Sequence, residues 1–193
     1  LNILPVIEQG LGGRRKQGNL KLTASVSLTY KPWSWLTLEG KVAPRFHWNT
    51  NHTFEDFIVY HSDPYGTVSN ATNVEHNSLY EGRSRYFYGN YQFTATFNKT
   101  FAKNHEVRVL LGASRETMDG STLNAKRYDY AYPDYESINA GADNELKENG
   151  GAREQLALQS YFGRVNYNYK ERYLFEANIR FDGSSRFARG HRW

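Results

Sequence analysis

The chain has 193 residues and a formal net charge of +4 at neutral pH; this length suits one domain or part of one, and its dispersed Lys and Arg do not predict a nucleic-acid partner. Aromatic residues make up 16% of the chain, which argues against disorder because disordered segments are poor in them. It contains no cysteine, so a disulfide framework and a cysteine-based zinc site are excluded, and no apolar run approaches the ~18 residues of a transmembrane helix.

The first two predicted strands form a hairpin. From Leu20 to Tyr30 every second residue is apolar and the residues between are polar, a period of two that places each set on one face of a strand. After a turn that contains Pro32, residues 36–48 repeat the pattern. Pro44 cannot donate a ladder hydrogen bond, so we expect a bulge or a locally broken pairing there.

The remaining predicted strands form two more hairpins. Four segments alternate in the same way: residues 90–98, 106–113, 161–169 and 173–181. Short connections, residues 99–104 and 170–172, close the two hairpins. Leu156 and Leu158 lie in the opposite phase to the strand that follows them, which predicts a bulge near Gln159.

The spacing of the connections predicts the fold class. Long polar stretches, residues 49–84 and 117–153, separate the hairpins. The apolar stretch of each strand runs about 9–13 residues, and a tilted membrane strand needs about 9–11. We therefore predict an all-β fold: an antiparallel, up-and-down transmembrane β-barrel segment of about six strands in three hairpins, with short periplasmic turns and long extracellular loops.

The aromatic residues fall into two levels. At the short-turn end lie Tyr30, Trp33, Trp35, Phe97, Phe101, Tyr167, Tyr169 and Tyr173. Near the long-loop end lie Phe46, Trp48, Phe87 and Phe181. Two such levels are typical of the interfacial girdles of outer-membrane barrels. A water-soluble sandwich or barrel, with the apolar face packed in a core, remains the alternative.

Two segments near the C-terminus carry a family resemblance. Residues 160–173 read SYFGRVNYNYKERY, and residues 182–187 read DGSSRF. Together they resemble the barrel signature of the SusC/RagA family, the TonB-linked outer-membrane transporters of Bacteroidetes. The signature positions are Tyr161, Phe162, Gly163, Arg164, Asp182, Gly183, Ser184, Ser185, Arg186 and Phe187. Over residues 1–154 the resemblance is only architectural.

The resemblance implies a function and partners. Family members are plugged barrels of the 22-strand class in the cell outer membrane. They import glycan oligomers or peptides, couple to TonB through the plug region and work with a SusD-like surface lipoprotein. The chain starts at Leu1 and stops at Trp193 just after a strand-like run. We therefore expect residues 1–193 to be one partial barrel domain, with the plug, the N-terminal domain and the other strands absent from it. A passive porin and a soluble β-rich glycan-binding module are the alternatives.

No motif predicts catalysis or a cofactor. The six His residues are scattered and form no His-Glu-x-x-His or His-x-His pair, and catalysis needs several convergent groups. The Asp-Gly pair at residues 182–183 is typical of a turn. Asp182 and Arg186 could form a rim ion pair, which would contribute little if exposed. We expect no enzyme activity.

One loop is the candidate ligand or partner site. Its candidate residues are Tyr128, Tyr130, Tyr132, Asp134, Tyr135 and Glu136. Tyr supplies rigid, amphipathic area for sugars or protein partners, although a compact loop packed on itself is equally compatible. The carboxylates of Asp129, Asp134, Glu136 and Asp143 could also bind calcium, but their spacing lacks the EF-hand pattern.

Charged residues on the polar alternation are expected to line the barrel interior. These lumen-facing candidates are Glu39, Lys41, Arg45, Arg108, Arg164, Glu176 and Arg180. We expect them to pair across strands, where each pair contributes a few tenths to about 1 kcal/mol, or with the plug.

Overall fold

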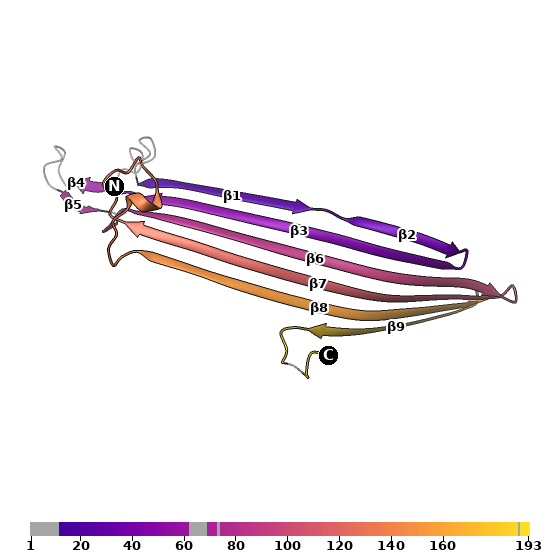
Figure 1. Cartoon of the computed structure of the whole chain (residues 1–193). Helices are drawn as coiled ribbons and strands as arrows, with labels where there is room; N and C mark the ends of the chain where they lie inside the picture. The colour runs from indigo at the N-terminus through magenta and orange to yellow at the C-terminus, as the bar shows by residue number, and fades with distance from the viewer. Residues whose placement is uncertain (1–11, 62–68, 73, 189) are drawn as a thin grey trace. The chain divides into compact units, whose positions relative to one another are not determined.

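The computed structural model describes residues 12–61, 69–72, 74–188 and 190–193, and for 59–61 and 69–72 the backbone alone. Its elements are β1 (Gly13–Thr23), β2 (Val26–Trp33), β3 (Leu36–Glu55), β4 (Val59–His61), β5 (Ser69–Thr72), β6 (Ser78–Phe101), β7 (His105–Tyr128), the 3₁₀ helix η1 (Ile138–Ala140), β8 (Glu148–Tyr169) and β9 (Tyr173–Ser184). Seven strands form one sheet in the order β1-β3-β6-β7-β8-β9, in which β2 also pairs with β3 (Figure 1). The fold is thus all-β, as predicted, and β4 pairs with β5 separately.

Three tight turns close the three predicted hairpins. Ser34 and Trp35 join β2 to β3. The backbone N–H of Asn104 donates to the carbonyl of Phe101 at 3.2 Å, and that of Arg172 to the carbonyl of Tyr169 at 3.0 Å. The two central residues of each of these turns have positive φ: Ala102 (45°), Lys103 (64°), Lys170 (54°) and Glu171 (56°). Positive φ at both positions defines a type I′ turn, whose twist matches that of the flanking strands.

The strand register confirms two chemically distinct faces. Val26 lies opposite Val42 in the β2–β3 pair, and Tyr161 lies opposite Phe181 in the β8–β9 pair. Directly opposed residues of antiparallel strands share a face, so the apolar alternations of paired strands coincide. The polar alternations coincide in the same way, with Asn166 opposite Glu176. A slip of one residue would exchange the two faces.

Pro44 interrupts the pairing as predicted, although the break appears in the neighbouring strand. The N–H of Ala24 donates to the Pro44 carbonyl at 3.0 Å, but Pro44 has no N–H to donate in return. The chain leaves strand geometry at residues 24–25, between β1 and β2, while β3 continues through Pro44.

The predicted bulge near Gln159 is wrong. In the β8–β9 pair the register runs from Leu158 opposite Ser184 to Tyr169 opposite Tyr173 without a shift. Leu158 simply occupies a position on the polar alternation. The predicted ion pair of Asp182 with Arg186 is also wrong: Asp182 accepts a hydrogen bond from Arg180 Nε at 2.8 Å, because residues two apart on a strand share a face.

Both long polar stretches begin and end in strand, which corrects the predicted loop lengths. β3 extends to Glu55 and β6 starts at Ser78, while β7 extends to Tyr128 and β8 starts at Glu148. The connections between hairpins are therefore residues 56–77 and 129–147 rather than 49–84 and 117–153. The strand ends lack an apolar alternation, so their sequence resembles that of a loop although their backbones pair.

The chain divides into two compact units. Unit 1 comprises Leu1–Leu20, His47–Arg85 and Ser121–Arg153, and unit 2 comprises Lys21–Phe46, Tyr86–Gly120 and Glu154–Trp193. Among the described residues, the buried apolar side chains are Phe54, Leu79 and Tyr130, all in unit 1.

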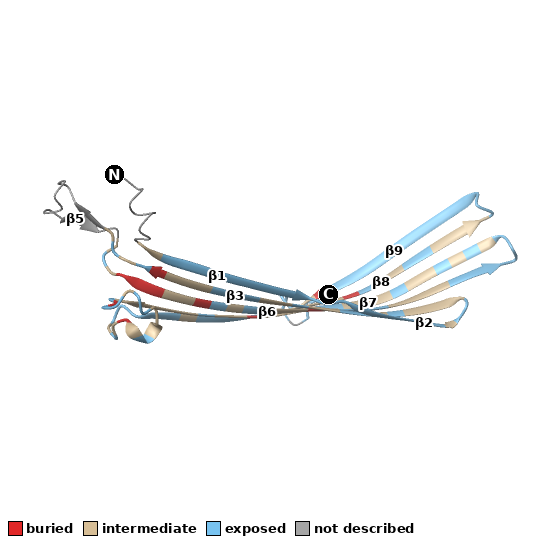
Figure 2. Ribbon diagram, turned by 90° about the horizontal axis from the view of Figure 1, so that it is seen from above, coloured by how far each residue is buried: buried red, intermediate tan, exposed pale blue. Residues whose placement is uncertain are grey.

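In unit 2 the apolar residues are mostly exposed, and β2 and β9 are exposed along nearly their whole length (Figure 2). Leu28 of β2 is 75% exposed and Ile179 of β9 is 58% exposed. Large contiguous apolar patches on a protein surface mark partner or membrane contacts. In the part of the chain that the structure describes, no helix is both long and apolar enough to cross a membrane.

Candidate functional site

The predicted partner loop lies in unit 1, within residues 129–147 (the docked loop), which connect β7 to β8. Asn77 fastens its first residues. The Asn77 side-chain amide donates to the Tyr130 carbonyl at 2.9 Å, and the Tyr130 N–H donates to Asn77 Oδ1 at 2.7 Å. Asn77 is only 2% exposed, so both of these bonds are shielded from water. Nothing in the sequence pattern singles out Asn77.

Tyr130 anchors the docked loop in the small core of unit 1. Its ring is 5.5 Å from that of Phe54 in an edge-to-face arrangement, and Leu79 and Ile138 belong to the same cluster. Burial raises the pKa of the Tyr130 hydroxyl. This candidate residue is therefore a structural anchor, and not a surface available to a ligand.

A chain of charged hydrogen bonds ties the docked loop to three strands. Arg14 Nε of β1 donates to Glu136 Oε1 at 2.5 Å. The other Glu136 oxygen pairs with Nε2 of His52 on β3, and His52 Nδ1 lies 2.7 Å from Glu81 Oε1 on β6. Glu136 is a second anchor, since its side chain is only 10% exposed.

The network favours a charged His52. Burial opposes protonation of the ring, but hydrogen bonds to Glu81 and Glu136 and their charges outweigh it and raise the pKa of His52 above 6.5. Burial also opposes ionisation of Glu136, but His52 and Arg14 outweigh it and lower the pKa of Glu136 below 4.5. With both ring nitrogens facing carboxylates, the doubly protonated imidazolium can donate to each.

The other candidate loop residues are exposed or lie at the end of β7. Tyr132 and Tyr135 are 77% and 66% exposed, and the Asp134 side chain is fully exposed, 3.9 Å from Arg14. Tyr128 donates from its hydroxyl to Glu148 at 2.5 Å. The loop thus presents two exposed Tyr rings on a backbone fixed by buried anchors.

The carboxylates considered for calcium do not converge. Asp129 accepts from Asn144 at 2.9 Å and contacts His76, Glu136 faces His52, and Asp143 pairs with Lys147 at 2.7 Å. In the ranges that the structure describes, no group of three or more His, Cys, Asp or Glu is arranged to hold a metal ion.

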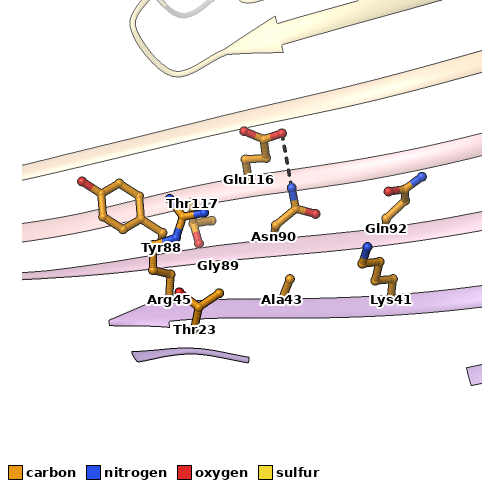
Figure 3. A pocket seen from close by; sticks show the side chains of 10 residues that line it. All are labelled: Thr23, Lys41, Ala43, Arg45, Tyr88, Gly89, Asn90, Gln92, Glu116 and Thr117. Carbon is orange, nitrogen blue, oxygen red and sulfur yellow. Dashed lines mark hydrogen bonds between the residues drawn. The ribbon is translucent and has the colours of Figure 1, made fainter. Parts of the chain in front are cut away.

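On unit 2 the polar alternations of β1, β3, β6 and β7 line a shallow hollow of about 320 Å³ (Figure 3). Lys41 and Arg45 project into it from one strand, and on the neighbouring strands Asn90 donates to Glu116 at 3.4 Å. Glu39 lies opposite Thr29 on the same alternation as Lys41. The hollow is open and of mixed charge, and it holds no arrangement typical of catalysis.

The remaining lumen-facing candidates lie on β7, β8 and β9, also in unit 2. Arg108, Arg164 and Glu176 line one hollow. Two of them are bonded to an amide: Arg164 donates to Asn178 at 2.7 Å, and Glu176 accepts from Asn178 at 2.8 Å. Arg180 donates to Ser160 at 3.0 Å, across the strand pair.

Three of the signature residues, Tyr161, Gly183 and Ser185, pack around the end of β9. Tyr161 stacks on Trp193, with ring centroids 5.7 Å apart. A Cβ at Gly183 would lie 2.9 Å from the same indole, so a side chain at this position would displace Trp193. The hydroxyl of Ser185 accepts from the N–H of Ala157 at 2.9 Å. These three residues therefore have structural contacts between β8 and the end of β9.

The main sheet is antiparallel and has one apolar and one polar face. This arrangement is typical of the wall of a membrane β-barrel, which is the class of protein that the fold defines. No family model matches the chain. Over 119 residues it is 36% identical to the TonB-dependent receptor P39 of Formosa agariphila, a match that covers 61% of this chain and 11% of that receptor. Over 51 residues it is 47% identical to the TonB-dependent receptor SusC of Bacteroides thetaiotaomicron, covering 26% of this chain and 5% of SusC.

The fold is also similar to a solved structure, that of the RagAB peptide transporter, with a TM-score of 0.76 at 18% identity over 92% of this chain and 19% of that one. The chain spans between 5% and 11% of the length of the curated relatives it matches. In sequence and fold it is thus similar to a barrel segment of SusC/RagA-like TonB-dependent receptors, which confirms the resemblance of its signature segment. These relatives are named as receptors, and the chain is similar to them rather than to enzymes.

Proposed function

We propose that the chain forms part of the barrel wall of a TonB-dependent importer in the bacterial outer membrane. The register carries this proposal: apolar residues face apolar residues across the β2–β3 and β8–β9 pairs, and polar residues face polar ones. The apolar face is exposed, as a lipid-facing surface would be. The matches to TonB-dependent receptors support coupling to TonB, which would act through segments outside this chain.

The polar face would then line the passage for cargo. Its charged residues are those predicted to face the lumen: Glu39, Lys41, Arg45, Arg108, Arg164, Glu176 and Arg180. An amide partner holds Arg164 in place without neutralising it, whereas Arg180 is paired with Asp182 as well as bonded to Ser160. Such a wall offers hydrogen bonds to oligomeric cargo, either glycans or peptides, without a tight binding site that would oppose release.

The proposal includes a SusD-like surface lipoprotein as partner, and the docked loop is where we place one of its contacts. Within unit 1, alternation along β1 and β3 puts Arg14 and His52 on the same side as Leu20 and Trp48. The loop that they bind therefore lies over the apolar-alternation side, away from the polar one. This position favours a protein partner over cargo for Tyr132 and Tyr135.

A pair of matched substitutions tests the orientation of the wall. Val26 is 69% exposed on the apolar alternation, and Ser27 follows it on the polar one, opposite Lys41. An Arg on the lipid face near the bilayer centre costs about 2–4 kcal/mol. Val26→Arg should therefore sharply reduce the heat-modifiable barrel in the outer membrane, whereas Ser27→Arg should assemble normally.

The experiment uses the protein that carries this chain, expressed with its own flanking sequence. If both variants assemble alike, or if Val26→Arg merely gives soluble protein of lower stability, the membrane-wall proposal is overturned. A soluble glycan-binding module would give the second result. A passive porin would assemble as predicted but would transport without TonB, so uptake in a strain lacking TonB separates the two.

A further inference from the structure

A basic cluster lies on unit 1, on the side that carries Leu20 and Trp48. It comprises Lys16 of β1, Arg83 and Arg85 of β6, and Arg153 of β8, and all four residues are exposed. Neither the polar passage nor the docked loop uses these side chains. They stand immediately beside the aromatic level that Trp48 marks near the long-loop end of the strands.

Strand alternation and contacts within unit 1 place the four residues on one side. Lys16 is four residues from Leu20 on β1, so alternation gives them the same face. On β3, His52 is four residues from Trp48 and bonds Glu81 of β6. Because residues at even spacing along a strand share a face, Arg83 and Arg85 of β6 lie on the same side as Glu81.

The two following strands continue the same side. Arg85 Nε donates to the Ser121 hydroxyl of β7 at 3.0 Å. A Cβ on Gly151 of β8 would meet the Leu123 side chain at 3.7 Å, and Leu123 shares its face with Ser121. Arg153, two residues beyond Gly151, therefore lies on the same side as Arg85.

The cluster is electrostatically unbalanced. Glu81 and Glu136, acidic groups of this side in unit 1, are held by His52 and Arg14. Asp119, which shares the alternation of Ser121 on β7, accepts from Gln155 at 2.6 Å. Across the described residues, no carboxylate lies within salt-bridge distance of any of the four cluster side chains. Arg85 donates to the Ser121 hydroxyl through Nε, so the two terminal nitrogens of Arg85 take no part in this hydrogen bond.

We propose that the basic cluster binds the phosphate groups of anionic lipid headgroups that surround the barrel. The inference rests on the proposed orientation of the apolar alternation toward lipid. Aromatic residues such as Trp48 mark the depth of the membrane–water interface, so Arg and Lys just beyond Trp48 on the lipid side meet the headgroup layer. Guanidinium groups bind phosphate oxygens in a bidentate geometry, and long basic side chains reach toward that layer.

The test compares two triple variants of the protein purified with its native flanking sequence. The cluster variant carries Arg83→Gln, Arg85→Gln and Arg153→Gln. The control carries Arg15→Gln, Lys103→Gln and Arg172→Gln, exposed basic residues outside the cluster, and so has the same net charge. Binding is measured in detergent against diphosphorylated lipid A and against the same lipid after removal of both phosphates.

Wild type and the control should bind the phosphorylated lipid more tightly than the dephosphorylated one. The cluster variant should lose this preference, weakening binding by about a hundredfold if each basic residue contributes as it does at an anionic membrane surface. Equal binding by the cluster variant and the control, or no phosphate preference in wild type, overturns the inference. If the cluster variant keeps lipid binding but loses the surface lipoprotein, the cluster is a protein contact and the inference is also wrong.

Two precautions keep the result decisive. Where the triple variant does not assemble, Arg153→Gln alone is compared with Arg15→Gln, and a loss of phosphate preference is still expected. The Val26→Arg and Ser27→Arg pair is scored in parallel. If that pair behaves as proposed while lipid binding does not change, only the inference about the cluster fails and the proposed barrel wall stands.

Discussion

Asn77 shows how a single polar residue can determine the position of a loop. Its amide makes two hydrogen bonds to the backbone of Tyr130, a residue 53 positions away in the chain. No periodicity or motif in the sequence connects residues so far apart, so the anchor could not be found before the fold was known. The Tyr-rich composition of the loop was visible, but which Tyr is buried depends on this distant pairing.

Asn77→Ala should release the docked loop. The substitution leaves the N–H and carbonyl of Tyr130 without partners in a buried setting, which costs about 1–3 kcal/mol for each unsatisfied group. Amide hydrogen exchange across residues 129–147 should accelerate markedly, with little change in β8 and β9. Tyr132→Ser is the matched control, because Tyr132 is exposed and its removal should leave exchange unaltered. Equal protection in both variants would show that Asn77 does not anchor the loop.

At the scale of elements, the tight turns are open to improvement. Ala102 and Lys103 both have positive φ, a conformation that costs most L-residues energy and suits Asn and Gly. Ala102→Asn with Lys103→Gly should therefore stabilise the β6–β7 hairpin by about 0.5–1 kcal/mol. The gain should raise the urea midpoint of the assembled barrel.

A matched change outside the positive-φ positions provides the control for the turn. The φ of Asn104, which follows Lys103, is not positive. Asn104→Gly adds only freedom to the unfolded chain, so it should lower the urea midpoint or leave it unchanged. A midpoint that does not rise for the Asn-Gly variant would mean that strain in this turn is relieved elsewhere.

The strands show how far sequence reasoning reaches. Alternation between apolar and polar residues predicted the two faces of the strands and the turns. Each face meets a different environment, so the residue type changes at every second position. The ends of β6 and β8 were missed for the same reason. Residues 78–86 carry Glu81, Arg83 and Arg85 on the side where Phe87 follows, so the alternation disappears although the backbone continues to pair. Strand ends that meet water or loops on both faces show no apolar–polar alternation in the sequence.

At the scale of the whole molecule, docking of the loop should depend on pH. The pKa of His52 is raised, so its contribution is complete below 6.5 and is lost as the pH rises through the folded value. The pKa of Glu136 is lowered, so its contribution is present above 4.5 and is lost as the pH falls through the folded value. Docking should therefore be strongest between these limits and should weaken above neutrality.

Protection factors for residues 129–147, corrected for intrinsic exchange, should fall as the pH rises above 6.5 and through the raised pKa of His52. His52→Gln should remove most of this decline, because the neutral amide does not titrate. His47→Gln, which alters a different, partly buried histidine that bonds Asn19, should keep it. A decline of the same size in His52→Gln would assign the pH dependence to another group.

The docked loop presents Tyr132 and Tyr135 at the surface of unit 1, and the proposed partner is a surface lipoprotein. Exposed Tyr rings on a rigid backbone bind partners at a low cost in entropy. Replacing both residues with Ser should weaken the complex at least about tenfold, since a truncated anchor costs about 2 kcal/mol or more, while loop protection stays as in wild type. Tyr173→Ser, an equally exposed Tyr beside the short β8–β9 turn, should leave affinity unchanged. Asn77→Ala undocks the same loop without removing either ring, so its affinity for the lipoprotein separates the placement of the rings from their presence. A loss that matches that of the double Ser variant means that placement matters as much as presence. Unaltered affinity in both variants excludes the loop from the interface.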